Sequence, residues 1–213
     1  MNRPVEAASD PKWRRLPEER PQQILIAAIE VFAEHGIADA KLEEIAARAG
    51  VSKGTIYLYF ASKEELFRAV VQQLLVPRIV EVERALHDGT PTQQLERYMR
   101  LQWAHFDQPG TAGWIRLVLT ELHKHPDLQA FYYAEVIAAS NQTLGEIVKR
   151  GVATGEFRTI DPPVVVSMFK SMALMHVLWS QTPRPVNVAH SHRATIDDMV
   201  DFVLHALRPD APR

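Results

Sequence analysis

The sequence contains no cysteine. This excludes disulfides, thiolate metal sites, cysteine nucleophiles and redox sensing through thiols. The chain also lacks a Gly-x-Ser-x-Gly nucleophile motif and a glycine-rich phosphate-binding loop. Because no residue pattern supports an enzyme, we predict no catalytic residues and no cofactor.

An excess of positive charge and an uninterrupted apolar run are absent as well. The formal net charge is −2. This disfavours a protein that coats nucleic acid over a wide surface, although it leaves room for local positive charge.

The most apolar span, Pro162 to Ser180, is interrupted by Lys170 and His176, so we predict a buried helix and no membrane span. No apolar run follows a basic start, which predicts no signal peptide and a cytoplasmic location.

Two histidine pairs raise the question of a metal site. His123 and His125 flank Lys124, and His190 and His192 flank Ser191. Ligands two residues apart on a helix point to different sides, so neither pair chelates a metal easily in a helix. We therefore predict no metal site.

Apolar residues recur at helical spacing along the whole chain, and no segment alternates as a strand does. We predict an all-α fold: a three-helix helix-turn-helix head and a larger helical body. The first expected helix begins at 17 or 21 and ends at 35. The others cover about 42–49, 53–60, 62–86, 92–106, 114–123, 128–151, 164–179 and 194–207. Pro77 is expected to kink or break the fourth helix. The helix at 164–179 is apolar nearly all round and should be buried on several sides.

The loop from His87 to Pro91 is the strongest candidate for a domain boundary. We predict a flexible arm at 1–16, a DNA-binding head at 17–66, a connecting helix at 67–87 and a ligand-binding and dimerisation body at 88–213. The arm carries Lys12, Arg14 and Arg15. It could enter a minor groove or remain a solvated tail, and the sequence leaves both open.

The stretch from Ala49 to Leu66 organises the head. Gly50 suits the left-handed end of one helix, and Ser52 supplies a side-chain oxygen that can cap the next. Ser62, followed three residues later by Glu65, forms a capping box for a longer helix. Two short helices joined by a tight turn that contains glycine make the helix-turn-helix layout. In the second of these helices, Ile56 and Phe60 are one turn apart and should face inward.

Two segments, AAIEVFAEHG and LEEIAARAGVSKGTIYLYFASKEEL, resemble the TetR family of bacterial transcriptional regulators over about Ile24 to Leu66. The resemblance implies an all-α homodimer whose helical body holds both a small-molecule effector and the dimer interface. It also implies a repressor that leaves a near-palindromic double-stranded DNA operator when the effector binds. The body is similar only in its size and helical character.

The resemblance places DNA contacts at matching positions, namely Ser52, Lys53, Gly54, Thr55, Tyr57, Tyr59 and Lys63. We expect Tyr59 and Lys63 to hold phosphates, and Lys53, Thr55, Tyr57 and Leu58 to face base edges. Two positions depart from the family pattern. Ala40-Lys41 replaces a frequent Thr-Thr pair, which makes Lys41 the substitute phosphate contact. Leu58 stands where a polar residue is expected, and it suits a thymine methyl group.

Aromatic and methionine side chains are frequent in the body, and a helical cavity lined by them suits a bulky apolar or aromatic ligand. The candidate lining residues are Trp103, Phe106, Trp114, Leu117, Tyr132, Met168, Met172, Met175, His176 and Trp179. For each of them an ordinary place in a packed core is the alternative.

Dimerisation is expected through the helices at 128–151 and 164–179, which would form a four-helix bundle across a two-fold axis. Ala138, Ala139 and Ser140 would allow close approach of the backbones. Two alternatives to the regulator remain open at this point. One is a helical small-molecule-binding protein or enzyme with a vestigial DNA-binding head, and the other is an architectural DNA-binding protein without a ligand.

Overall fold

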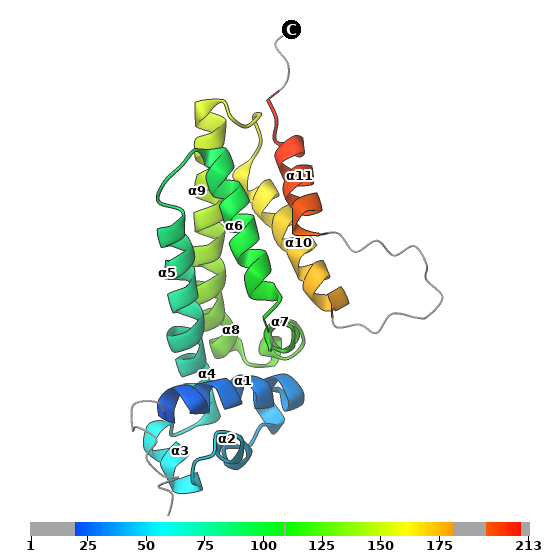
Figure 1. Cartoon of the computed structure of the whole chain (residues 1–213). Helices are drawn as coiled ribbons and strands as arrows, with labels where there is room; N and C mark the ends of the chain where they lie inside the picture. Colours follow the sequence, from blue (N-terminus) through cyan, green and yellow to red (C-terminus); the bar gives the residue numbers. More distant parts are fainter. Residues whose placement is uncertain (1–19, 109, 181–194, 210–213) are drawn as a thin grey trace, which may run out of the picture.

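The computed structural model describes residues 20–108, 110–180 and 195–209, which contain helices and no strand. A small head of α1 (Arg20–Asp39), α2 (Leu42–Arg48) and α3 (Lys53–Tyr59) lies at one end of a longer helical body (Figure 1). The predicted all-α class is therefore confirmed. The basic arm with Lys12, Arg14 and Arg15, and the pair His190 and His192, lie outside the described residues.

Two glycines in left-handed backbone conformations shape the head. Gly36 has a φ of 77° and interrupts α1 where the sequence predicts its end, with one more turn following it. Gly50 has a φ of 68° directly after α2. Glycine adopts this conformation without the steric cost that a Cβ atom brings. Gly50 thus ends α2 as predicted, whereas Gly36 produces a kink at the predicted end of the first helix, and α1 continues to Asp39.

A continuous helical run leaves the head. It consists of α4 (Lys63–Val70), the π-helical turn η1 (Val71–Leu75) and α5 (Val76–Ala85). Pro77 lies in the first turn of α5 and has no N–H to donate. The wider π-helical turn just before it absorbs the irregularity, and the N–H of Val76 donates to the carbonyl of Val71. The expected perturbation at Pro77 thus takes the form of a π-helical turn, and the helix continues to Ala85.

The body packs around three long helices, α6 (Pro91–Phe106), α9 (Ala139–Thr154) and α10 (Pro162–Ser180) (Figure 1). The predicted helix at 128–151 is present as an unbroken run of segments. This run consists of α8 (Pro126–Tyr132), the π-helical turn η3 (Tyr133–Ala138) and α9. The remaining elements of the body are α7 (Thr111–Thr120), the 3₁₀ turn η2 (Leu122–Lys124) and α11 (Ile196–Ala206).

Head and body share a hydrophobic core. The core that holds Phe32 of the head and Phe67 of α4 also contains buried residues of α7, η2 and α8. Among them is Trp114, whose ring stacks on Phe67 with 5.1 Å between the centroids. A second core, around Tyr98 and Leu144, lies wholly within the body. The predicted domain ranges divide the chain in sequence, but the first core spans the division between head and body.

The helix α10 differs from its prediction. It was expected to be buried on several sides, and for the single chain this is wrong. Val164, Met168, Met175 and Trp179 are exposed on its outer face, with Met168 at 65%. By length and composition alone this helix could cross a membrane, and 22% of the span from Pro162 to Trp179 is buried. Among the described residues of the single chain, none covers this row of large apolar side chains.

A close approach of α1 and α7 fixes the head on the body. A Cβ atom built on Gly113 of α7 would lie 2.7 Å from the Cβ atom of Ala33 of α1. Side-chain carbons do not approach so closely, and Ala33 has no flexible end that could move aside. Glycine at 113 therefore permits the observed spacing of the two helices.

We predict that Gly113→Ala lowers the free energy of unfolding by about 1–3 kcal/mol because the added methyl overpacks this contact. The loss should appear although alanine favours a helix over glycine by roughly 1 kcal/mol. In an Ala33→Gly background the space for the methyl exists, so the same substitution should cost nothing. Urea denaturation of the four proteins of this cycle gives the comparison. An equal cost in both backgrounds would contradict the assigned contact.

Candidate nucleic-acid interface

The side chain of Ser52 caps the first turn of α3. The Oγ atom of Ser52 accepts a hydrogen bond from the N–H of Thr55 at 3.1 Å and lies 2.8 Å from the hydroxyl of Thr55. Ile56 is fully buried and Phe60 nearly so. Both the predicted cap and the predicted inward face of α3 are confirmed, which leaves the other faces of α3 open to a partner.

The start of α4 differs in one detail from the predicted capping box. The Oγ atom of Ser62 accepts from the N–H of Glu65 at 3.1 Å, as expected. The carboxylate of Glu65, however, accepts from the N–H of Ala61 at 2.9 Å and not from that of Ser62. The glutamate side chain reaches one residue further back along the chain, so only half of the box forms.

The helix α3, which carries most of the predicted DNA-contact residues, lies at the end of the molecule that is far from α10 and α11 (Figure 1). Lys53, Gly54, Tyr57, Leu58 and Tyr59 are exposed on α3, and Leu58 is the most exposed of the large apolar residues at 84%. The remaining predicted contacts are exposed or partly buried at neighbouring helix starts: Lys41, Ser52, Thr55 and Lys63. All nine therefore lie on α3 or at the starts of α2, α3 and α4.

Two lysines of this group differ in their surroundings. Lys41 is exposed before α2, and its side chain forms no cap on that helix. The ammonium group of Lys63 donates to the carbonyl of Ala38 at the end of α1. Because an ammonium group has three donors, Lys63 can keep this bond and still face a phosphate.

One carboxylate that is not among the contacts predicted from the sequence, Glu43 in the first turn of α2, lies among these residues. Glu43 Oε1 is 2.7 Å from Lys53 Nζ and accepts a bond from the hydroxyl of Tyr57 at 3.3 Å. The hydrogen bond with Lys53 lowers the pKa of Glu43 and raises the pKa of Lys53. Nothing in the spacing along the chain could reveal this pair, because its members belong to different helices.

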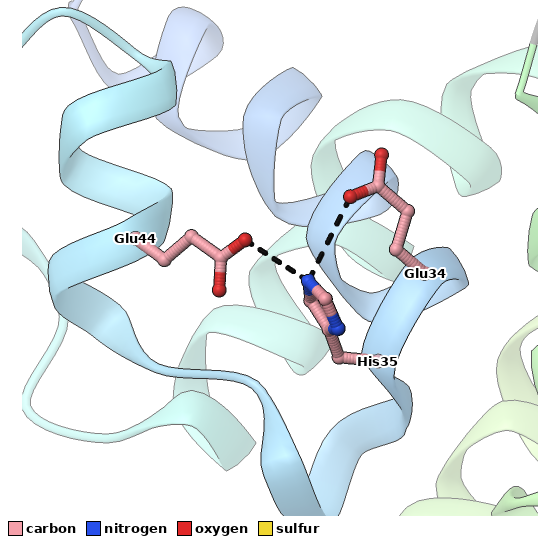
Figure 2. Close-up of side chains that lie close together, drawn as sticks. All are labelled: Glu34, His35 and Glu44. Atoms are coloured by element: carbon pink, nitrogen blue, oxygen red, sulfur yellow. Dashed lines mark hydrogen bonds and ion pairs between the residues drawn. The ribbon is translucent and has the colours of Figure 1, made fainter.

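A second polar network lies between α1 and α2 (Figure 2). The Nε2 atom of His35 is 3.0 Å from Glu44 and 3.7 Å from Glu34. Arg48 donates to both carboxylate oxygens of Glu34, at 2.6 and 2.7 Å, and this bond lowers the pKa of Glu34. One histidine and two carboxylates, with ligand atoms within 4.8 Å of one another, resemble a metal-ion site, but Arg48 already bonds both carboxylate oxygens of Glu34. The network acts as a link that orients α2 on α1.

The ten predicted ligand-contact residues separate into three groups. Between α6 and α10, Trp103 and His176 lie with 3.6 Å between ring centroids, and Phe106 and Met172 pack against the same core. The second group belongs to the core that joins head and body: Trp114, Leu117 and Tyr132. The third group is exposed on the outer face of α10: Met168, Met175 and Trp179. The structure therefore does not bring all ten around one cavity.

A groove of about 490 Å³ lies between η3–α9 and α10, and none of the ten lines it. It is mostly apolar, but it contains Lys170 and Asn141. Burial lowers the pKa of Lys170 to about 8. The side-chain oxygen of Asn141 is buried with no hydrogen-bond partner among the described atoms. Sequence reasoning missed both residues, although a lysine inside the most apolar helix was a visible signal.

Comparisons with known proteins agree with this arrangement. Residues 24–70 match the family model of bacterial regulatory proteins of the tetR family, and residues 85–201 match that of the tetracyclin repressor-like C-terminal domain. The transcriptional regulator RutR of Escherichia coli K12 is 35% identical, with 93% of this chain and 95% of RutR covered. The transcriptional activator FasR of Mycolicibacterium smegmatis is 44% identical over 89 residues, and the match spans only 41% of the length of FasR.

Solved structures share the fold. That of FadR from Bacillus subtilis, in complex with stearoyl-CoA, has a TM-score of 0.66 at 23% identity. The similarity covers 86% of this chain and 95% of FadR. At this level of identity the likeness concerns the fold alone.

Three substitutions of Ser52 should separate capping from DNA contact. Ser52→Ala removes the cap and should lower the free energy of unfolding by about 1 kcal/mol, whereas asparagine and aspartate cap as well as serine. Ser52→Asp should keep wild-type stability but weaken DNA binding, because it places a negative charge at the start of α3. Ser52→Asn, the matched control, should preserve both. Urea denaturation and fluorescence anisotropy with duplex DNA measure the two effects, and wild-type DNA affinity of Ser52→Asp would argue against phosphates near this helix start.

Proposed function

Because the chain belongs to the TetR family of bacterial transcriptional regulators, we propose that it is a cytoplasmic homodimeric repressor. A small apolar or aromatic ligand would release it from a near-palindromic operator. The chain is a DNA-binding regulator and not an enzyme, as its match to RutR over 93% of its length indicates. The observation that carries the proposal is the exposed face of α3. Ser52 caps this helix, and the core shared by head and body holds it in place.

DNA binding would use α3 and the starts of α2, α3 and α4, where the nine predicted residues lie. The side chains of Lys53, Thr55, Tyr57 and Leu58 would face base edges when α3 enters the major groove. Tyr59, Lys63 and the free N–H groups at the helix starts would hold phosphates, with Lys41 beside them. Gly54 would let the backbone come close to the DNA. Two such helices in a dimer must lie about 34–36 Å apart to enter successive major grooves.

Dimerisation would cover the exposed apolar row of α10. Val164, Met168, Met175 and Trp179 lie on one helix face, and the groove toward α9 continues this surface. Pairing α9 and α10 with those of a second copy makes a four-helix bundle, which buries these side chains. We assign the row to a dimer and not to a membrane, because α10 packs on α9 and carries Lys170 in the middle of its length.

Ligand binding would act through the region between α6 and α10. Trp103, Phe106, Met172 and His176 offer aromatic and flexible apolar surface there, and FadR, which shares the fold, was solved with a ligand that has a long apolar chain. A shift of α6 would reach α7, which packs against α1 of the head. The ligand would need different affinities for the DNA-bound and released states to drive this change.

The DNA-binding part of the proposal predicts a salt-dependent preference for selected sites. From a pool of random duplexes the protein should enrich near-palindromic sites, and Tyr57→Ala should weaken binding to them by roughly tenfold or more, as the loss of a good base contact does. The melting temperature should stay close to that of the wild type, because Tyr57 is 46% exposed. A pool that stays random, or binding that ignores salt, would contradict the proposed function.

The dimer part predicts twice the chain mass of 24.1 kDa in solution. Met168→Glu should convert the protein to a folded monomer, because it places a charge in the proposed interface. Phe202→Glu is the matched control, since Phe202 of α11 is exposed to the same degree, 64% against 65%. Sedimentation at micromolar concentration measures both. A wild-type monomer, or equal effects of the two substitutions, would count against this interface.

A further inference from the structure

The proposed DNA-facing side of α3 is paired with a carboxylate of α2. Glu43 Oε1 holds Lys53 Nζ at 2.7 Å and accepts a hydrogen bond from Tyr57 at 3.3 Å. The ammonium group of Lys53 also lies 5.9 Å from the centre of the Tyr57 ring. The three side chains therefore form one triangle across the two helices of the helix-turn-helix unit.

This triangle is not needed to hold the helices together. The side chains of Glu43 and Lys53 are 46% and 67% exposed, and ion pairs at such sites contribute little to stability. Buried Ile45 and Ile56 already pack α2 and α3 in the hydrophobic core. The consequence of the triangle is therefore expected at the surface, where DNA would lie.

A carboxylate at this place would interact differently with the phosphates and with the bases of DNA. An unpaired Lys53 would attract any phosphate, whatever the base sequence. With Glu43 beside it, an approaching phosphate must displace the carboxylate or lie next to a like charge. The amino group of a cytosine, in contrast, can donate a hydrogen bond to a glutamate in the major groove. Beside DNA, Glu43 would thus oppose contacts with phosphates and would be able to accept a hydrogen bond from a cytosine.

We propose that Glu43 is a specificity-determining residue, which withholds Lys53 and Tyr57 from phosphates and lowers the affinity for DNA of arbitrary sequence more than for the operator. This inference rests on the proposed function, in which α3 enters the major groove. It also gives a role to an acidic residue at a surface where positive charge would otherwise favour binding to any duplex.

Glu43→Gln tests the inference, and the chain offers a matched control next to it. Glu44→Gln removes the same charge one residue away, so both variants alter the long-range field equally. Glu44 turns to the other side of α2, where it bonds with His35 and Arg48 of the link to α1. Melting temperatures of both variants establish that they are folded. The probes are a duplex selected by the wild-type protein from a random pool and a duplex of mixed sequence.

Glu43→Gln should raise the affinity for the mixed duplex by roughly 3- to 10-fold, and the dependence of log K on log salt should steepen by about 0.9 for each phosphate gained. The ratio of operator affinity to mixed-duplex affinity should fall. Glu44→Gln should leave this ratio at the wild-type value. In a Lys53→Met background Glu43→Gln should change the ratio much less, since the lysine that it releases is absent.

Two negative results have different meanings. Suppose that the wild-type protein selects a site, but Glu43→Gln keeps the ratio of operator affinity to mixed-duplex affinity or changes it only as much as Glu44→Gln does. The proposed role of Glu43 is then wrong, whereas the proposed function as a regulator is unaffected. If the wild-type protein selects no site, the proposed function itself fails, and this inference fails with it.

Discussion

The rest of the structure depends on the hydrophobic core shared by head and body. Phe67, at the start of the connecting helix, stacks on Trp114 of α7, and Gly113 lets α7 lie directly on α1. A head that packs so closely cannot turn freely on a flexible linker. Any change of the body that moves α7 must therefore move α1 as well, and with it the surface carried by α3. The same contact that stabilises the head would thus connect the proposed ligand region to the proposed DNA-binding surface.

Within the head, two neighbouring acidic residues of α2 bond in opposite directions. Glu44 bonds toward α1 through His35 and Arg48, whereas Glu43 bonds toward α3 through Lys53 and Tyr57. Neighbouring residues on a helix point in different directions, so one Glu-Glu pair can serve two helices. Such exposed pairs contribute little energy, but they restrict the orientation of side chains that a partner would meet.

The sequence predicts the head well because its signals are local. Gly36, Gly50 and Ser52 act within one turn of their own positions; Gly50 and Ser52 are found as predicted, and Gly36 kinks α1 at its predicted end. The signals fail where a contact joins distant segments. Neither the pairing of Glu43 with Lys53 nor the stacking of Trp114 on Phe67 can be derived from periodicity, and the ten apolar candidates of the body divide among three places. Composition alone cannot distinguish a helix buried in one chain from one that a second copy would cover, so the exposed face of α10 departs from the expected burial but fits the expected use of this helix in a dimer.

The modest charge of the chain fits a protein that must discriminate among DNA sequences. Phosphate contacts raise the affinity for every duplex alike, whereas base contacts raise it for a few. With a formal net charge of −2, this chain has no general attraction to DNA, so binding must come from a local surface. On that surface Glu43 offsets the charge of Lys53, and the exposed Leu58 adds apolar contact without charge. On such a surface the proposed phosphate contacts would position the head, and the base contacts would determine which sequences it prefers.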